Sequence, residues 1–255
     1  MPLNPHSLDD VQWMRVALYL VLGPILIGHV CTYLKGRYRW AGGYTRKLNH
    51  VGIMLVTAPL LAVLPDRQLL MSVLVATSLQ VGLYWVAAYS RLPVIHALAA
   101  HSLRERDAPQ SRFFFLMPMI TTNVALVMAV LMFPMHLVKV AFFTVALGDG
   151  FAEPIGLWLG RSNTYQVRDF FWGERNTKSL AGSLTVFVFA GAVALTMLGT
   201  AHGGVDVPLA ICVLVYAVAM TLLEAMSPRG MDNMTIILLG PLLLMALLPT
   251  AVMAS

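Results

Sequence analysis

Four acidic residues lie where this apolar chain is not expected to carry charge. Asp149, Glu153, Glu224 and Asp232 each fall beside or within a long apolar segment, whereas charged residues make up only 11% of the chain. A carboxylate near a membrane segment is costly to bury, so each is a candidate for function by default. Carboxylates near a phosphate site usually hold Mg²⁺. We therefore predict that the four acids are ligands of a magnesium ion.

Asp149 lies in a glycine-rich stretch, ALGDGFAEPIGLWLGR. Gly148 and Gly150 flank it and Pro154 follows, so a straight helix through this stretch is not expected. A break at these glycines, with a new helix beginning near residues 152–154, would present free N–H groups and a positive helix end to a phosphate. Further glycines on this segment, Gly156 and Gly160, would leave room for a ligand or for a packed helix.

Basic residues that could neutralise phosphate follow in the segment RNTKSLAGS. Arg175 and Lys178 supply the charge, and Ser179 supplies a polar atom just before an apolar helix. The alternative is a juxtamembrane basic cluster with a serine helix cap. The stretch before it, TYQVRDFFWGE, mixes aromatic and charged residues and is typical of an interfacial segment.

A second basic cluster lies at the entrance of the second apolar segment, in YTRKLNH. Arg46 and His50 share one face of the expected helix, and Lys47 lies beside them. These side chains are candidates for binding phosphate. The alternative is an anchor of the positive-inside type.

The last polar piece is LLEAMSPRGMDNMT. A hairpin across SPRG would bring Glu224 and Asp232 toward one site. The alternative is an ordinary capped turn, in which Asp232 or Asn233 is the N-cap of the next helix. Glu224 is harder to explain as a cap.

Composition sets the elements that must position these residues. Hydrophobic residues make up 58% of the chain and its mean hydropathy is +0.76, which excludes a soluble enzyme, a disordered chain and a coiled coil. We expect an all-α, polytopic membrane helix bundle of about eight transmembrane helices, forming a single integral-membrane domain over residues 1–255. The expected segments are Val11–Leu34, Val51–Leu64, Leu69–Tyr89, Phe113–Phe133, Met135–Leu147, Leu180–Leu198, Val207–Met226 and Thr235–Met253.

The basic residues predict how the chain is oriented. All but three of the 17 Lys and Arg residues fall in alternate connections, the exceptions being Arg15, Arg67 and Lys139. The positive-inside rule therefore places those connections in the cytoplasm and both termini outside. On this assignment the four acids lie at the cytoplasmic ends of helices. The net charge of +5 reports orientation rather than nucleic-acid binding, because no long basic run exists.

In this order, the pieces resemble the motifs of the CTP-dependent polyprenol kinases: dolichol kinase, phytol kinase and their bacterial relatives. That family belongs with the membrane cytidylyltransferases. The matching residues are Arg46, Lys47 and His50; Gly148–Gly156 with Gly160 and Arg161; Lys178–Ser183; and Glu224 with Asp232 and Asn233. Two positions depart from the family pattern. Glu153 stands where the plant phytol-kinase pattern has Asp, and Ala181 stands where many relatives have Glu.

The resemblance implies a kinase that transfers phosphate from CTP to a membrane isoprenoid alcohol of the polyprenol, phytol or farnesol type, with Mg²⁺ as cofactor. The predicted catalytic residues are Asp149, Lys178, Asp232 and His50. The predicted nucleotide-binding residues are Gly148, Gly150, Arg46, Lys47, Arg175, Ser179, Gly182 and Asn233. The group that accepts the proton of the alcohol stays open among Asp149, Asp232 and His50.

The expected partners are a nucleoside triphosphate, the lipid alcohol and membrane lipids, with no nucleic acid. The expected location is a bacterial inner membrane or a eukaryotic endomembrane, with the active site facing the cytoplasm. One alternative is a CTP:phospholipid cytidylyltransferase, which forms a CDP-lipid and pyrophosphate. Another is a transporter or a membrane scaffold, but acids grouped at one membrane boundary argue against a transport site at the midplane.

One further motif is similar to part of the phosphatidate cytidylyltransferase signature. It is HGGVD, residues 202–206, but no Arg follows the Asp and no second acid comes after it. We interpret this motif as a flexible turn.

Overall fold

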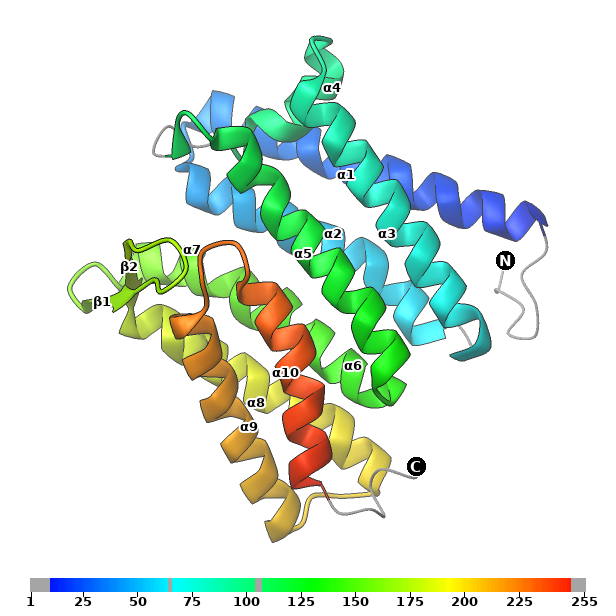
Figure 1. The fold of residues 1–255 in the computed structure, drawn as a ribbon, viewed down its shortest axis with the longest axis vertical. Coiled ribbons are helices and arrows are strands. Elements are labelled where there is room, and N and C mark those ends of the chain that lie inside the picture. The colour runs from blue at the N-terminus through cyan, green and yellow to red at the C-terminus, as the bar shows by residue number, and fades with distance from the viewer. Residues whose placement is uncertain (1–9, 64–65, 104–106, 249–255) are drawn as a thin grey trace. The chain divides into compact units, whose positions relative to one another are not determined.

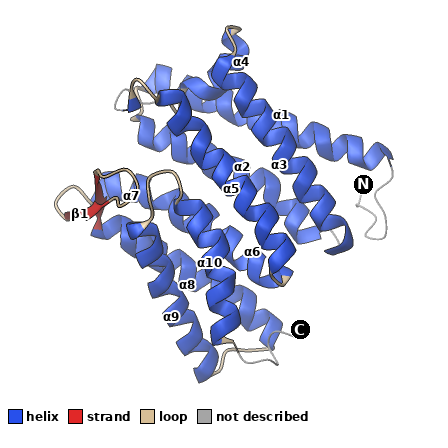
Figure 2. Ribbon diagram, in the orientation of Figure 1, coloured by secondary structure: helices blue, strands red, loops and turns tan. Residues whose placement is uncertain are grey.

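The computed structural model describes residues 10–63, 66–103 and 107–248. In this part of the chain the fold is all-α apart from one short β hairpin (Figure 2). The chain divides into two compact units, residues 1–127 and 128–255, and each is described by itself. The all-α prediction is confirmed, whereas the hairpin was not predicted.

Six helices among the described residues are long and apolar enough to cross a membrane. They are Met14–Tyr38, Gln68–Tyr89, Ser111–Met132, Met135–Leu159, Leu180–His202 and Val207–Met226. These helices indicate a multi-pass integral membrane protein.

Two of the predicted segments are not among these six helices. The second, Val51–Leu64, belongs to a longer helix whose first turns are polar, so that its apolar part spans only about 20 Å against the 30 Å of a bilayer core. The last, Thr235–Met253, contains the shorter apolar helix Asp232–Leu247. Its end, like Leu64, lies outside the described residues.

Unit 1 is a bundle of apolar helices in which polar side chains of α2 and α3 hydrogen-bond to each other at two places. Its elements are α1 (Asp10–Tyr38), α2 (Gly42–Val63), α3 (Asp66–Tyr89), α4 (Pro93–Ala100) and the larger part of α5 (Ser111–Met132). The Asn49 amide and the Tyr84 hydroxyl hydrogen-bond to each other between α2 and α3. One turn along, the Gln80 amide donates to the Thr57 hydroxyl at 3.0 Å. Such pairing is expected where no water reaches the backbone and side chains.

Unit 2 contains the remaining elements (Figure 1). They are α6 (Met135–Phe143), the π-helical turn η2 (Thr144–Asp149), α7 (Gly150–Leu159), β1 (Thr164–Arg168), β2 (Arg175–Ser179), α8 (Leu180–His202), α9 (Val207–Met226) and α10 (Asp232–Leu247). α8 packs against α9, α7 and η2, and α10 packs against α6 and α9. The elements that carry the predicted acids therefore share one interior.

The chain does not break at Gly148–Gly150. α6, η2 and α7 follow one another without an interruption, so the predicted helix start near residues 152–154 is wrong. The π-helical turn accommodates one additional residue within the helix, and a Cβ at Gly148 would lie 3.6 Å from the Cα of Val186 in α8. Because the helix is continuous, it presents no free N–H groups at this point.

The turn predicted at HGGVD is present between α8 and α9. Gly203 and Gly204 have φ values of +75° and +157°, which residues other than glycine rarely adopt. The Asp206 carboxylate then accepts a hydrogen bond from the Leu209 N–H at 2.9 Å and caps α9. Helix capping therefore explains the acid of the HGGVD motif, Asp206.

Candidate functional site

Three of the four predicted acids come together in unit 2. Oxygen atoms of Asp149, Glu224 and Asp232, one from each side chain, lie within 4.8 Å of one another. Asp149 is 2% exposed and Glu224 is 5% exposed, whereas Asp232 is half-buried. We call these three residues the acidic triad. They come from η2, the last turn of α9 and the first turn of α10.

Asp149 is the last residue of the π-helical turn. The sequence predicted Asp149 at a helix end, but it lies within a long helical segment. Glu224 and Asp232 do lie at helix ends, as predicted. In the same turn, the buried Thr144 hydroxyl hydrogen-bonds to the Tyr216 hydroxyl of α9 at 3.1 Å. This contact ties η2 to α9. Single π-helical turns are frequent at functional sites.

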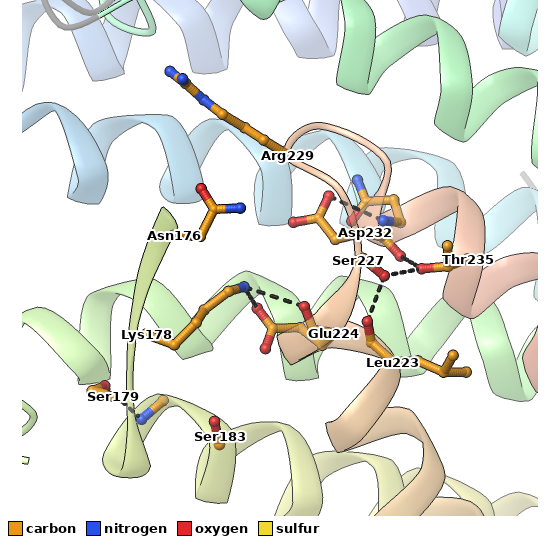
Figure 3. Close-up of polar contacts among 12 residues, drawn as sticks. Asn176, Lys178, Ser179, Ser183, Leu223, Glu224, Ser227, Arg229, Asp232 and Thr235 are labelled. Carbon is orange, nitrogen blue, oxygen red and sulfur yellow. Dashed lines mark hydrogen bonds and ion pairs between the residues drawn. The ribbon is translucent and has the colours of Figure 1, made fainter. Parts of the chain in front are cut away.

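The turn between α9 and α10 holds the other two acids. The Ser227 hydroxyl donates to the Leu223 carbonyl and contacts the Thr235 hydroxyl (Figure 3). The Thr235 hydroxyl donates to the backbone carbonyl of Asp232 at 2.8 Å. The end of α9 and the start of α10 are thus bonded to each other, and the turn fixes Glu224 relative to Asp232.

Asp232 is not used as a helix cap. The residue at the N-cap position of α10 is Met231, and no side chain caps this helix end. The alternative in which Asp232 or Asn233 is the N-cap is therefore wrong. Asn233 is buried at 4% exposure in the first turn of α10, next to the triad in the chain. An acid in a first turn also favours the positive end of the helix dipole, but this role does not require two further carboxylates beside it.

Lys178 meets the triad from the hairpin. β2 carries it to the end of α9, where its ammonium forms an ion pair with the Glu224 carboxylate and donates to the Glu224 carbonyl at 3.3 Å (Figure 3). Burial would lower the pKa of Lys178, but the carboxylates of the triad outweigh burial and raise it above its ordinary value. Lys178 is therefore a cation at neutral pH. The structure brings Asp149, Glu224 and Asp232 together with this lysine, as predicted, but it does not bring Glu153 into the same group.

The donor set fits a magnesium ion. Three carboxyl groups face one ammonium group, so the cluster carries surplus negative charge when all three are ionised, and a divalent cation would balance it. Mg²⁺ takes oxygen ligands at about 2.1 Å in an octahedron, which places adjacent ligands about 3.0 Å apart. The triad oxygens lie within 4.8 Å of one another, so the three side chains would have to move closer together to bind one ion. The ion pair uses one oxygen of Glu224, and its second oxygen remains to bind a cation.

Ser179 and its neighbouring glycines form a packing contact. The Ser179 hydroxyl accepts a hydrogen bond from the Gly182 N–H at 3.1 Å and caps α8, which is the alternative role considered for it. A Cβ at Gly182 would lie 2.9 Å from the Ala152 carbonyl, and one at Gly156 would lie 2.7 Å from the Ser179 hydroxyl. The glycines thus let α7 and the start of α8 pack directly against each other, which is the packing role considered for them.

We expect Gly160→Ala to destabilise the protein by about 1–3 kcal/mol, because the added methyl group would overlap the Ser179 hydroxyl and the Gly156 carbonyl. The matched control is Gly82→Ala within α3, where the added methyl group meets nothing within 4 Å. The control should be neutral or slightly stabilising, since alanine favours a helix. Denaturant unfolding in detergent measures both, and equal midpoints for Gly160→Ala and the wild type would contradict the close packing.

Two predicted residues are not part of the cluster of acids. Arg175 is exposed, and its guanidinium donates to the Gln166 side chain at 3.5 Å. Since side chains alternate along a strand, it lies on the face of β2 opposite Lys178. Glu153 lies one turn after Asp149, half-buried in α7, and its carboxylate is not among those that meet in the described residues.

Arg46, Lys47 and His50 lie in the first turns of α2 in unit 1, whereas the triad belongs to unit 2. Lys47 is only 5% exposed, which does not fit a solvated positive-inside anchor. The nucleotide-binding and catalytic roles predicted for these three residues stay predictions.

Asp169 was not predicted to be functional. It lies in the hairpin, where it is buried and bonded to Asn176 and to the α9–α10 turn. The signal in the sequence was an acid within the aromatic stretch RDFFWGE, which the interfacial interpretation did not explain.

Comparison with known proteins gives no further assignment of this site. The chain matches no protein-family model, no curated protein and no solved structure.

Proposed function

We propose that this membrane protein is a kinase that transfers the terminal phosphate of CTP to a membrane isoprenoid alcohol. One observation carries the proposal: three buried or half-buried carboxylates and a lysine from four separate segments meet in unit 2, beside the turn between α9 and α10. Burying so much charge in a membrane protein is costly, and structural packing does not require it. Phosphoryl transfer from a metal–nucleotide complex does require carboxylates and a cation together.

The chain's own residues have distinct roles in this proposal. The triad would hold Mg²⁺, which when bound neutralises the phosphate oxygens of the nucleotide. The Lys178 ammonium would pair with a phosphate oxygen and stabilise the charge that develops during transfer. Because Lys178 is held by Glu224, it is already oriented toward the cluster before substrate binds.

Proton transfer from the alcohol needs a base near its hydroxyl group. Asp149 and Asp232 both lie in the cluster and are candidates. The long apolar helices supply a lipid-facing surface along which an isoprenoid alcohol would reach the site. We propose that this site faces the cytoplasm, as the distribution of basic residues predicts.

Labelled CTP tests the proposed reaction. The purified protein in liposomes is incubated with Mg²⁺ and a panel of farnesol, phytol and a longer polyprenol. We expect label from the γ position of CTP to enter the lipid fraction, and label from the α position to stay in water. The opposite pattern, with a phospholipid phosphate as acceptor, would identify a CTP:phospholipid cytidylyltransferase. No label in lipid from either position would contradict both reactions.

A further inference from the structure

A buried carboxylate joins the hairpin to the turn between α9 and α10. Asp169, which follows β1, is 2% exposed. Its Oδ1 accepts hydrogen bonds from the backbone N–H groups of Phe171 and Trp172, each at 3.0 Å. Its Oδ2 accepts from the Asn176 amide at 3.0 Å and from the backbone N–H of Arg229 at 2.8 Å. The Asp169 side chain therefore hydrogen-bonds both within the hairpin and to the turn between α9 and α10.

A second contact holds the same turn. The indole N–H of Trp172 donates to the backbone carbonyl of Arg229 at 3.2 Å. The Arg229 guanidinium lies 3.4 Å from the Glu174 carboxylate. Both backbone polar groups of Arg229 are thus bonded to the hairpin, which makes this a fixed junction and not a chance approach of two loops.

Asp169 is charged at neutral pH. Burial would raise the pKa of its carboxyl group, but the donors from Arg229, Trp172, Asn176 and Phe171 outweigh burial and hold the pKa below its ordinary value. Four donors to one carboxylate are a charge-assisted arrangement, which is stronger than neutral hydrogen bonds.

The junction connects the two halves of the candidate site. Asn176 lies on the same face of β2 as Lys178, since side chains alternate along a strand (Figure 3). Arg229 lies in the turn that leads directly into Asp232. Asp169 thus accepts one hydrogen bond from Asn176, two residues before Lys178, and another from Arg229, three residues before Asp232.

We propose that Asp169 is a positioning residue, which holds Lys178 and Asp232 at the separation that binding of a divalent cation and a phosphate requires. The proposal deepens the proposed function and rests on it. Asp169 itself does not touch the cation or the nucleotide in this account. It acts through the hairpin and the turn.

The test uses Asp169→Asn in the full-length protein. Asparagine keeps the shape but has only one acceptor oxygen, so its NH₂ group must face either the hairpin N–H groups or those of Asn176 and Arg229. We expect the Kd for Mn²⁺, used as the probe in place of Mg²⁺, to rise about 10- to 100-fold, as when a group that orients metal ligands is lost. Trypsin should also cut faster after Arg175, because the hairpin is released from the turn.

The matched control is Asp206→Asn, which changes a capping aspartate at the other end of α9 and should leave the Mn²⁺ Kd unchanged. Asn176→Ala removes one donor and keeps the carboxylate, and it should weaken Mn²⁺ binding in the same direction if Asp169→Asn does not fold. Wild-type Mn²⁺ affinity in the folded variants would overturn the proposal, whatever trypsin shows. Because Mn²⁺ binding is measured without CTP or prenol, a wild-type protein that binds Mn²⁺ but transfers no phosphate would contradict only the proposed function.

Discussion

Asp149→Asn is expected to lower phosphoryl transfer at least about 100-fold while leaving the protein folded. The substitution keeps the shape of a side chain that is buried in η2, but it removes one negative charge from the triad. A neutral amide costs less to bury than a carboxylate, so stability should be unchanged or higher. Initial rates with γ-labelled CTP, alongside unfolding in detergent, measure the two effects separately.

The control for this prediction is again Asp206→Asn, since Asp206 is an exposed acid explained by helix capping. It should transfer phosphate at the wild-type rate. If Asp149→Asn does so as well, the triad is not part of the active site. If Asp149→Asn is inactive only because it is unfolded, Asp149 has a structural role.

Lys178→Ala is expected to cost about 3–5 kcal/mol of stability as well as activity, because it leaves the buried Glu224 carboxylate without its ammonium partner. The double variant Lys178→Ala with Glu224→Gln removes both charges of the pair. It should recover most of the lost stability, since no charge is left unpaired. It should recover no phosphoryl transfer, because both the phosphate-binding cation and a metal ligand are gone.

A double-mutant cycle of unfolding free energies, with transfer rates for the same four proteins, checks this prediction. Coupling between Lys178 and Glu224 near zero would show that the ion pair contributes nothing to folding. A double variant that recovers activity together with stability would show that the pair is structural, and would remove Lys178 from the proposed mechanism.

The sequence predicts the membrane helices and the acids of the site for the same physical reason. Hydrocarbon excludes charge, so long apolar stretches predict the helices, and acids such as Asp149 and Glu224 that interrupt them are candidates for function. Their convergence could be predicted only as a possibility, because it depends on which helices pack together. The number of long helices differed from the prediction at α2, where polar residues occupy the first turns, and at the last segment, of which the structure describes only the shorter helix α10.

The errors arise where tertiary contacts decide local structure. Gly148 and Pro154 would weaken an isolated helix, but packing against α8 and a π-helical turn keep the segment continuous. The Ser179 hydroxyl caps α8, and its predicted role in nucleotide binding stays a prediction. Arg175 was grouped with Lys178 because the two are close in sequence, but a β-strand places them on opposite faces.

The role of Asp169 could not be predicted because its partner Arg229 is distant in the sequence. Hydrogen bonds within the hairpin, such as those to Phe171 and Trp172, follow from a local turn. The bond to the backbone of Arg229 follows only once α9 has brought the next turn alongside. Charged residues that are satisfied by distant backbone groups leave no periodic pattern in a sequence.

Binding of Mn²⁺ to the purified protein tests most directly whether the triad is a cation site. The measurement is the loss of the free Mn²⁺ paramagnetic resonance signal on titration, in the wild type and in a variant with Asp149→Asn, Glu224→Gln and Asp232→Asn together. We predict saturable binding in the wild type, competition by Mg²⁺, and no such binding in the triple variant. Equal Mn²⁺ binding by a folded triple variant, or none by the wild type, would contradict the assignment of Asp149, Glu224 and Asp232 as metal ligands.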